Sequence, residues 1–148
     1  MPIMNCSTDS SLETIVSDLT LAIGQLLRRL RSEANPSALN LSQISALARI
    51  EHGGPMTTAE LARAESMKPQ SMGSILASLE HEGMIRRQPH PTDGRQVLFV
   101  LTEKGVEDRR RRQIAKRDWL TAAASNLDAE ELQALAAAIP LIRRIGES

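Results

Sequence analysis

The stretch that decides the fold runs from residue 57 to residue 102 and reads TTAELARAESMKPQSMGSILASLEHEGMIRRQPHPTDGRQVLFVLT. It opens with Thr57, and Glu60 follows three residues later, a capping box that satisfies free backbone amides at a helix start. A second helix is predicted to begin near Pro69, whose fixed φ and missing N–H suit the first turn. Gly83 is a natural stop for it. The pattern predicts two short helices joined by a tight turn.

The second helix is predicted to have one apolar and one polar face. Its apolar residues recur at i, i+3, i+4 and i+7 and indicate a single buried stripe: Met72, Ile75, Leu76 and Leu79. The opposite face is small and polar, and consists of Gln70, Ser74, Ala77 and His81, flanked by Ser71, Gly73 and Ser78. Such a face can approach a major groove closely, and Gln and Ser side chains can hydrogen-bond to base edges there. Lys68, just before the helix, is placed to meet a phosphate. The alternative is an ordinary solvated helix that is rich in serine.

Two strand-like runs follow the second helix, residues 84–88 and 97–101. The segment between them holds two prolines and then Asp93-Gly94, which are turn residues. We therefore expect a hairpin with a long polar tip, on which Arg95 lies beside Asp93. An arginine on a projecting hairpin can enter a narrow minor groove, where the negative potential is enhanced. The alternative is a solvated arginine that pairs with Asp93.

Taken together, these residues resemble the MarR family of winged-helix transcription regulators. The resemblance rests on the helix-turn-helix and on the segments MIRR at 84–87, DGR at 93–95 and LTEKG at 101–105. The segment KPQSMG at 68–73 is typical of one branch of the family. The resemblance covers essentially the whole chain. It implies that the second helix reads the major groove and that the wing arginine enters the minor groove.

The candidate DNA-binding residues are Lys68, Gln70, Ser71, Gly73, Ser74, Asp93 and Arg95. The resemblance assigns base reading to Gln70, Ser71 and Ser74, and the minor groove to Arg95. It also matches Asp93 to the family's aspartate that steadies the wing. Ser74 stands where many members carry a longer polar or basic residue.

The two ends of the chain are predicted to form amphipathic helices. Residues 1–9 are expected to be a mobile arm, and Ser10 to Glu13 form a capping box at the start of a helix that ends near Pro36. A last helix follows Asp128, and Pro140 should kink or interrupt it. Their apolar stripes either pack within the chain or form a dimer interface, and we favour shared burial. The predicted boundaries are dimerisation helices at 10–35 and 103–148 around a DNA-binding domain at 36–102.

Charge is balanced over the whole chain but not locally. The formal net charge is zero, whereas residues 86–117 carry ten Lys or Arg against four acidic residues. The electrostatic field near a binding surface, rather than the net charge of the whole chain, determines whether a protein is steered toward nucleic acid. Within this region, the charged segment 106–113 is predicted to contribute little to the core. It is either a basic connector that lies near phosphates or a solvated helix surface.

Several classes of protein are not supported by the sequence. The scarcity of aromatic residues favours helix packing, and the single Cys6 allows no intrachain disulfide, which fits the cytoplasm. We see no signal peptide and no apolar run of membrane-spanning length. The histidines at 52, 81 and 90 lack metal-ligand spacing, and no phosphate loop, nucleophile elbow or paired carboxylates indicate an enzyme or a cofactor.

The sequence therefore predicts a mainly α protein with a small β wing: a winged helix-turn-helix whose N- and C-terminal helices form a dimerisation pad. We expect a cytoplasmic homodimeric repressor that binds a pseudo-palindromic operator in double-stranded DNA and is released by a small molecule. The alternatives are a winged-helix protein-interaction module without DNA binding, or an oxidant sensor that uses Cys6. No residue identifies an effector ligand.

Overall fold

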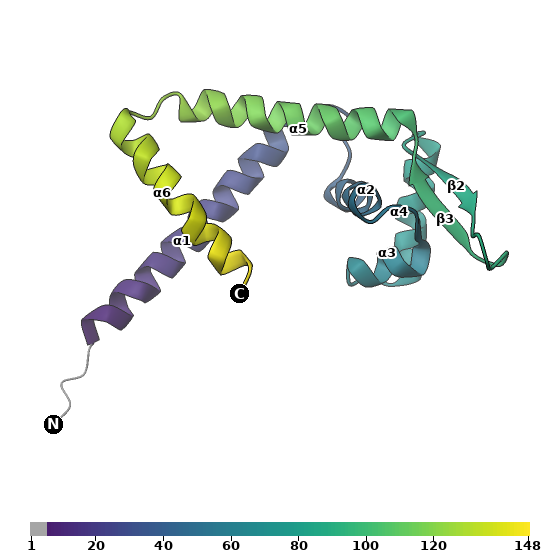
Figure 1. Cartoon of the computed structure of the whole chain (residues 1–148), viewed down its shortest axis with the longest axis horizontal. Helices are drawn as coiled ribbons and strands as arrows, with labels where there is room; N and C mark the ends of the chain where they lie inside the picture. Colours follow the sequence, from purple (N-terminus) through teal and green to yellow (C-terminus); the bar gives the residue numbers. More distant parts are fainter. Residues whose placement is uncertain (1–5) are drawn as a thin grey trace. The chain divides into compact units, whose positions relative to one another are not determined.

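The computed structural model describes the backbone of residues 6–148 and the side chains of residues 11–148. Six helices and three strands appear in this part of the chain, which confirms the predicted mainly α class with a small β wing (Figure 1). The helices are α1 Cys6–Glu33, α2 Leu41–Gly53, α3 Thr58–Ala64, α4 Pro69–His81, α5 Glu103–Ala124 and α6 Ala129–Gly146. The strands are β1 Met56–Thr57, β2 Ile85–Pro89 and β3 Val97–Leu101.

The chain forms two compact units. Residues 35–114 form the first, which we call the winged-helix unit. The described residues before Asn35 and residues 115–148 form the second, which we call the helical unit. The winged-helix unit is longer than the predicted domain of residues 36–102, because the first half of α5 belongs to it.

The core of the winged-helix unit lies between its helices and its sheet. The predicted stripe of α4 is confirmed, since Met72, Leu76 and Leu79 are buried and Ile75 packs against them. Helices α2 and α3 contribute further buried side chains, Ala46, Leu47, Ile50, Leu61 and Ala62. Because this stripe faces inward, the opposite side of α4 is turned to solvent.

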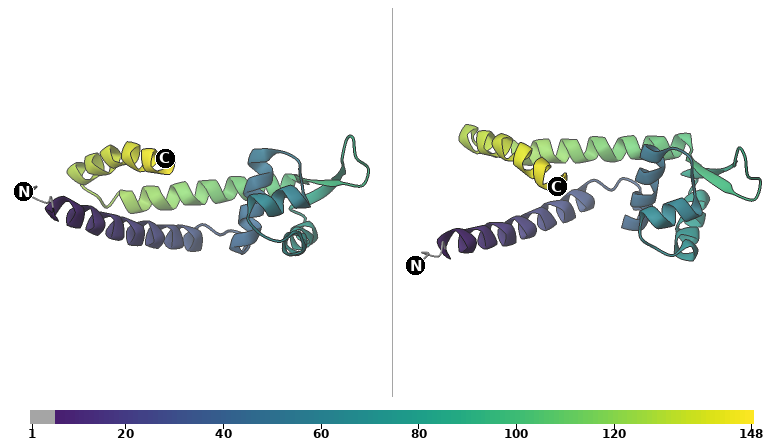
Figure 2. Two further views of the ribbon diagram at one scale, coloured as in Figure 1. Left: turned by 90° about the horizontal axis from the view of Figure 1, so that it is seen from below. Right: turned by 60° about the horizontal axis from the view of Figure 1, so that its bottom comes forward.

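The sheet is antiparallel, with strand order β1-β3-β2. The register of the predicted hairpin places Arg87 opposite Phe99 and Ile85 opposite Leu101. The third strand, β1, was not predicted, and it pairs Met56 with Phe99. Figure 2 shows the hairpin of β2 and β3 projecting from the helices of this unit.

The predicted helix ends are largely confirmed. Thr57 caps α3, since its hydroxyl accepts from the Glu60 amide at 3.2 Å. The Glu60 carboxylate in turn accepts from the Thr57 hydroxyl at 3.2 Å, a variant of the predicted capping box. Pro69 occupies the first turn of α4. Gly83 follows α4 with a φ of 75°, a left-handed conformation that glycine adopts without strain.

The helical unit differs from the prediction at the start of its first helix. Helix α1 begins at Cys6, so residues 6–9 are helical and not part of an arm, while the rest of the predicted arm lies outside the described residues. Helix α6 continues through Pro140, so of the two predicted effects of this proline the interruption does not occur and the kink stays a prediction. Within this unit, the Arg29 guanidinium lies 6.0 Å from the centre of the Trp119 ring, close enough for a cation–π contact.

The charged segment at the start of α5 is the largest departure from the prediction. Asp108, Arg109 and Arg112 are buried, although this segment was expected to contribute little to the core. Arg112 donates from Nε to Asp108 Oδ2 at 2.7 Å, from Nη1 to Asn35 Oδ1 at 2.8 Å and from Nη2 to Ser37 Oγ at 2.6 Å. Each nitrogen of the buried guanidinium thereby has a hydrogen-bond partner, and one of the partners is a carboxylate, which is the condition for burying a charge.

None of the helices found in residues 6–148 is long and apolar enough to cross a membrane. Within the same residues, no cluster of three or more His, Cys, Asp or Glu side chains could hold a metal ion.

Candidate nucleic-acid interface

The turn between α3 and α4 fixes the two helices relative to each other. Ser66 adopts a φ of 52° in this turn, which is uncommon for a residue other than glycine. The Met67 amide then returns to the Ala62 carbonyl at 2.9 Å, and the Met67 side chain packs against the core. The turn therefore holds α4 against α3 with one face outward, as a helix-turn-helix requires.

The outer face of α4 is exposed as predicted. We use this name for Gln70, Ser71, Gly73, Ser74, Ala77 and His81, of which all but the half-buried Gly73 are exposed. The Ser74 hydroxyl donates to the Gln70 carbonyl at 3.4 Å, a weak bond that a better acceptor can replace. Lys68 is also exposed and directly precedes the first turn of α4, where free backbone amides favour an anion.

Ser78 flanks this face but has a different role. Gln43 of α2 donates from Nε2 to Ser78 Oγ at 2.9 Å, and Ser78 Oγ donates to the Ile75 carbonyl at 2.7 Å. Ser78 therefore joins α2 to α4 inside the unit. The sequence pattern placed it beside the polar face and gave no sign of this contact, because its partner lies 35 residues away.

A cleft of about 650 Å³ lies beside the outer face of α4. Its walls come from the end of β1, from α3, from α4 and from the hairpin. Its lining residues are Thr57, Thr58, Ala59, Glu60, Arg63, Gly73, Ala77, Arg87, Arg95, Gln96, Val97 and Phe99. Of the seven predicted DNA-binding residues, the cleft brings together Gly73 and Arg95. The other five lie outside its lining, on α4, before it, or at the hairpin tip.

Three arginines and one acid line this cleft, which suits an anionic partner. Arg63 is exposed on α3. Arg87 is held by Glu80 at 3.1 Å and lies 5.7 Å from the centre of the Phe99 ring. Neither arginine was among the predicted site residues. The sequence indicates that one of Arg86 and Arg87 faces α4, because neighbouring residues of a strand point to opposite faces of the sheet. It does not show which of the two this is.

The hairpin tip holds Arg95 next to Asp93, as both predictions for this arginine required. Asp93 Oδ1 accepts from the Arg95 amide at 3.0 Å and from Arg95 Nε at 3.4 Å. Asp93 Oδ2 accepts from Gln96 Nε2 at 3.3 Å. The Arg95 side chain is 93% exposed. Exposed ion pairs contribute little stability, so the guanidinium can exchange Asp93 for another anion.

The arginines of α5 are engaged by carboxylates. Arg109 lies 3.3 Å from Glu51, while Arg110 and Arg111 both contact Glu107, at 2.6 and 3.2 Å. Hydrogen bonding from Arg110 lowers the pKa of Glu107 to about 2. With Arg112 bound to Asp108, each arginine from 109 to 112 has an acidic partner. Glu107 and Asp108 are already among the four acidic residues of 86–117, so Glu51 is the only one of these partners that reduces the local basic excess counted from the sequence.

Comparisons with known proteins agree with this geometry. The model of the MarR family matches residues 39–97. A helix-turn-helix-type transcriptional regulator of Mycobacterium leprae is 38% identical over 128 residues, which cover 86% of this chain and 90% of that protein. A transcriptional repressor of the same type from Mycobacterium tuberculosis is 33% identical over 100 residues, with 67% and 68% covered.

Solved structures show the same fold. A crystal structure of a candidate transcriptional regulator from Pseudomonas aeruginosa is similar with a TM-score of 0.83 and 30% identity, over 93% of this chain and 97% of that one. Wild-type MarR from E. coli in its apo form is similar with a TM-score of 0.64 and 24% identity, over 86% of this chain and 96% of that one.

An exposed helix held by a helix-turn-helix, beside a projecting β hairpin, defines a winged helix-turn-helix protein. The sequence relatives extend this likeness over nearly the whole chain. The chain belongs to the MarR family and is a DNA-binding transcription regulator. The resemblance stated from the sequence is thereby confirmed.

Proposed function

We propose that this regulator is a homodimeric repressor that binds a pseudo-palindromic operator and is released by a small molecule. The observation that carries the proposal is the cleft that Gly73 of α4 and Arg95 of the hairpin both line. It puts a helix face that can enter a major groove next to an arginine that can enter the adjacent minor groove. The cytoplasm, where a bacterial operator lies, is the proposed place of action.

Each predicted residue has a proposed role in DNA binding. Gln70, Ser71 and Ser74 are exposed on α4, and their side chains suit base edges in the major groove. Lys68 neutralises a phosphate, which gives salt-dependent affinity without sequence preference. Gly73 permits close approach of the DNA. At the wing, Arg95 enters the minor groove and Asp93 holds the turn below it.

The proposal of a dimer rests on apolar side chains that the single chain leaves exposed. Helix α6 includes no buried residue, yet Leu132, Leu135, Ile139, Leu141, Ile142 and Ile145 lie on it, all exposed. Helix α1 also exposes Leu12, Ile15, Val16, Ile23 and Leu26. Large exposed apolar patches mark interaction surfaces. A two-fold dimer would present its two winged-helix units to DNA about one DNA turn (~34 Å) apart.

The proposal that the protein represses transcription and is released from DNA by a small molecule rests on other grounds than the proposal of a dimer. The relative from Mycobacterium tuberculosis is called a repressor. A small molecule can release a repressor only if it binds the DNA-free state more tightly than the DNA-bound state. In a dimer, such a molecule would act by changing the distance between the two winged-helix units.

The proposal is tested by fluorescence anisotropy with duplex DNA from upstream of the protein's own coding region. A scrambled duplex is titrated beside it, and both are measured at several salt concentrations. We expect selective binding whose affinity falls steeply with salt, because several phosphates are neutralised. Arg95→Ala should weaken the selective binding, and if it does not, the wing contact is wrong.

The alternative function, a protein-interaction module, is favoured by two observations. The net charge is zero, and each arginine from 109 to 112 has an acidic partner. A folded dimer that binds neither duplex would support this alternative and contradict the proposed function.

A further inference from the structure

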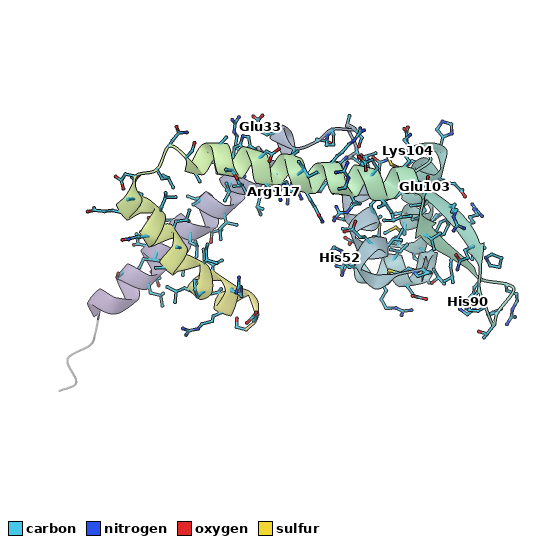
Figure 3. All side chains as sticks on the ribbon, turned by 45° about the horizontal axis from the view of Figure 1, so that its top comes forward. Glu33, His52, His90, Glu103, Lys104 and Arg117 are labelled. Atoms are coloured by element: carbon cyan, nitrogen blue, oxygen red, sulfur yellow. The ribbon has the colours of Figure 1, made fainter. Side chains whose placement is uncertain are left out.

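We infer that His90 is a positioning residue for DNA binding, because its ring nitrogen Nδ1 holds the turn that presents Arg95. The inference rests on the proposed contact of Arg95 with DNA. His90 lies on the hairpin, close to its tip (Figure 3). Its spacing from His52 and His81 in the sequence is not that of metal ligands.

The His90 ring accepts hydrogen bonds from the backbone of its own turn. Nδ1 lies 3.2 Å from the Thr92 amide nitrogen and 3.0 Å from the Asp93 amide nitrogen. The Thr92 hydroxyl is 3.4 Å from the same atom. Pro91, between them, fixes its own φ. This is the arrangement by which Asn and Asp side chains close turns onto the backbone two residues ahead, here made by a histidine.

These contacts determine which ring nitrogen carries the proton. A backbone amide can only donate, so Nδ1 must be the accepting, unprotonated nitrogen. The neutral ring then carries its proton on Nε2. In the imidazolium form both nitrogens carry protons, so Nδ1 could no longer accept from either amide.

Asp93 connects the turn that His90 closes to Arg95. The Asp93 amide is bound by His90, and the Asp93 carboxylate accepts from both the amide and Nε of Arg95, at 3.0 and 3.4 Å. Among the residues described by the structure, Asp93 is the only hydrogen-bond partner of Arg95. The position of this exposed guanidinium therefore depends on the turn that His90 closes.

The variants His90→Asn and His90→Leu have side chains of equal shape and differ in whether the side chain can accept a hydrogen bond. They therefore test the role of the acceptor Nδ1 apart from the rest of the ring. In His90→Asn, the amide oxygen takes the place of Nδ1 and can accept from the same two amides. In His90→Leu, a methyl group stands there and cannot accept. Thermal unfolding of each variant should match the wild type, since the tip is remote from the core.

Operator affinity is measured for both variants, alone and combined with Arg95→Ala. We expect His90→Asn to bind within about twofold of the wild type and His90→Leu to lose about fivefold to tenfold, from two lost hydrogen bonds. In the Arg95→Ala background, His90→Leu should change the affinity by less than about twofold, because residues that act through one contact are not additive.

Wild-type affinity for His90→Leu, an equal loss for His90→Asn, or additive losses with Arg95→Ala would each overturn the inference. If Arg95→Ala itself binds normally, the proposed wing contact fails, and the role of His90 fails with it.

Discussion

Arg112 Nε donates to Asp108 Oδ2 at 2.7 Å, and the two side chains are only 2% and 6% exposed. A buried ion pair of this kind adds little net stability, because desolvation offsets the attraction. Removing one partner is costly, however, since the other charge is left buried and unpaired. The pair therefore makes the winged-helix unit sensitive to changes at a position that lies outside the proposed DNA contacts.

Arg112→Met should lower the free energy of unfolding by about 3 kcal/mol, because Asp108 is left as an uncompensated buried charge and Asn35 and Ser37 lose a donor. Urea denaturation measures this change. Arg111→Met is the matched control, since Arg111 is the adjacent residue and is 67% exposed, and surface pairs contribute about 0–1 kcal/mol. Equal, small losses for both variants would show that the buried network is dispensable.

Gly73→Ala should stabilise the fold and weaken operator binding. A Cβ added at Gly73 meets no atom within 4 Å, so the protein's own packing does not require the glycine. Alanine in a helix is favoured over glycine by about 0.5–1 kcal/mol. We expect the free energy of unfolding to rise by that amount and the operator affinity to fall about tenfold, through a loss of roughly 1.4 kcal/mol of contact energy. Unchanged affinity would mean that DNA does not approach Gly73.

Gly105→Ala should have the opposite effect on stability. A Cβ at Gly105 would collide with the backbone carbonyl oxygen of Met84, which cannot move aside as a flexible side chain can. The same carbonyl accepts from the Thr102 amide at 3.0 Å, so the start of α5 is fixed there. We expect a loss of about 2 kcal/mol or more, measured by thermal or urea unfolding. A stability equal to that of Gly73→Ala would contradict this close contact.

Leu135→Asp should shift the protein from dimer to monomer. Leu135 is an exposed apolar residue of α6, and a carboxylate in an apolar interface is desolvated without a partner. We expect the dimer dissociation constant to rise by about tenfold to a hundredfold, as measured by sedimentation velocity. Gln133→Asp, an exposed and already polar position on the same helix, is the control. A wild-type protein that is monomeric at the same concentration would contradict the dimer itself.

Much of the winged-helix unit could be predicted from local pattern. The stripe of Met72, Leu76 and Leu79 shows the period of a helix with one buried side, and Pro69 and Gly83 mark its ends. Turn residues likewise located the hairpin tip and the pairing of Arg95 with Asp93. These features depend on residues close together in sequence, so a single chain is enough to find them.

The missed features depend on contacts between distant residues. Strand β1 is only two residues long, too short for any periodicity, and it exists because β3 offers an edge to pair with. The spacing of Asp108 and Arg112 suggests an ion pair, but its burial depends on Asn35 and Ser37, more than 70 residues earlier. A run of arginines is usually solvated, and the sequence alone does not show which of them is enclosed.

The hydrogen bond between Asn35 and Arg112 also bears on how the chain can be rearranged. Asn35 is the first residue of the winged-helix unit, and Arg112 lies two residues before its last. The two points where the chain enters and leaves this unit are thus tied side by side. Segments whose ends meet tolerate insertion and circular permutation. Residues 35–114 therefore have the topology of a cassette, and because its end at residue 114 lies within α5, a winged-helix unit put in its place would have to supply the first half of that helix.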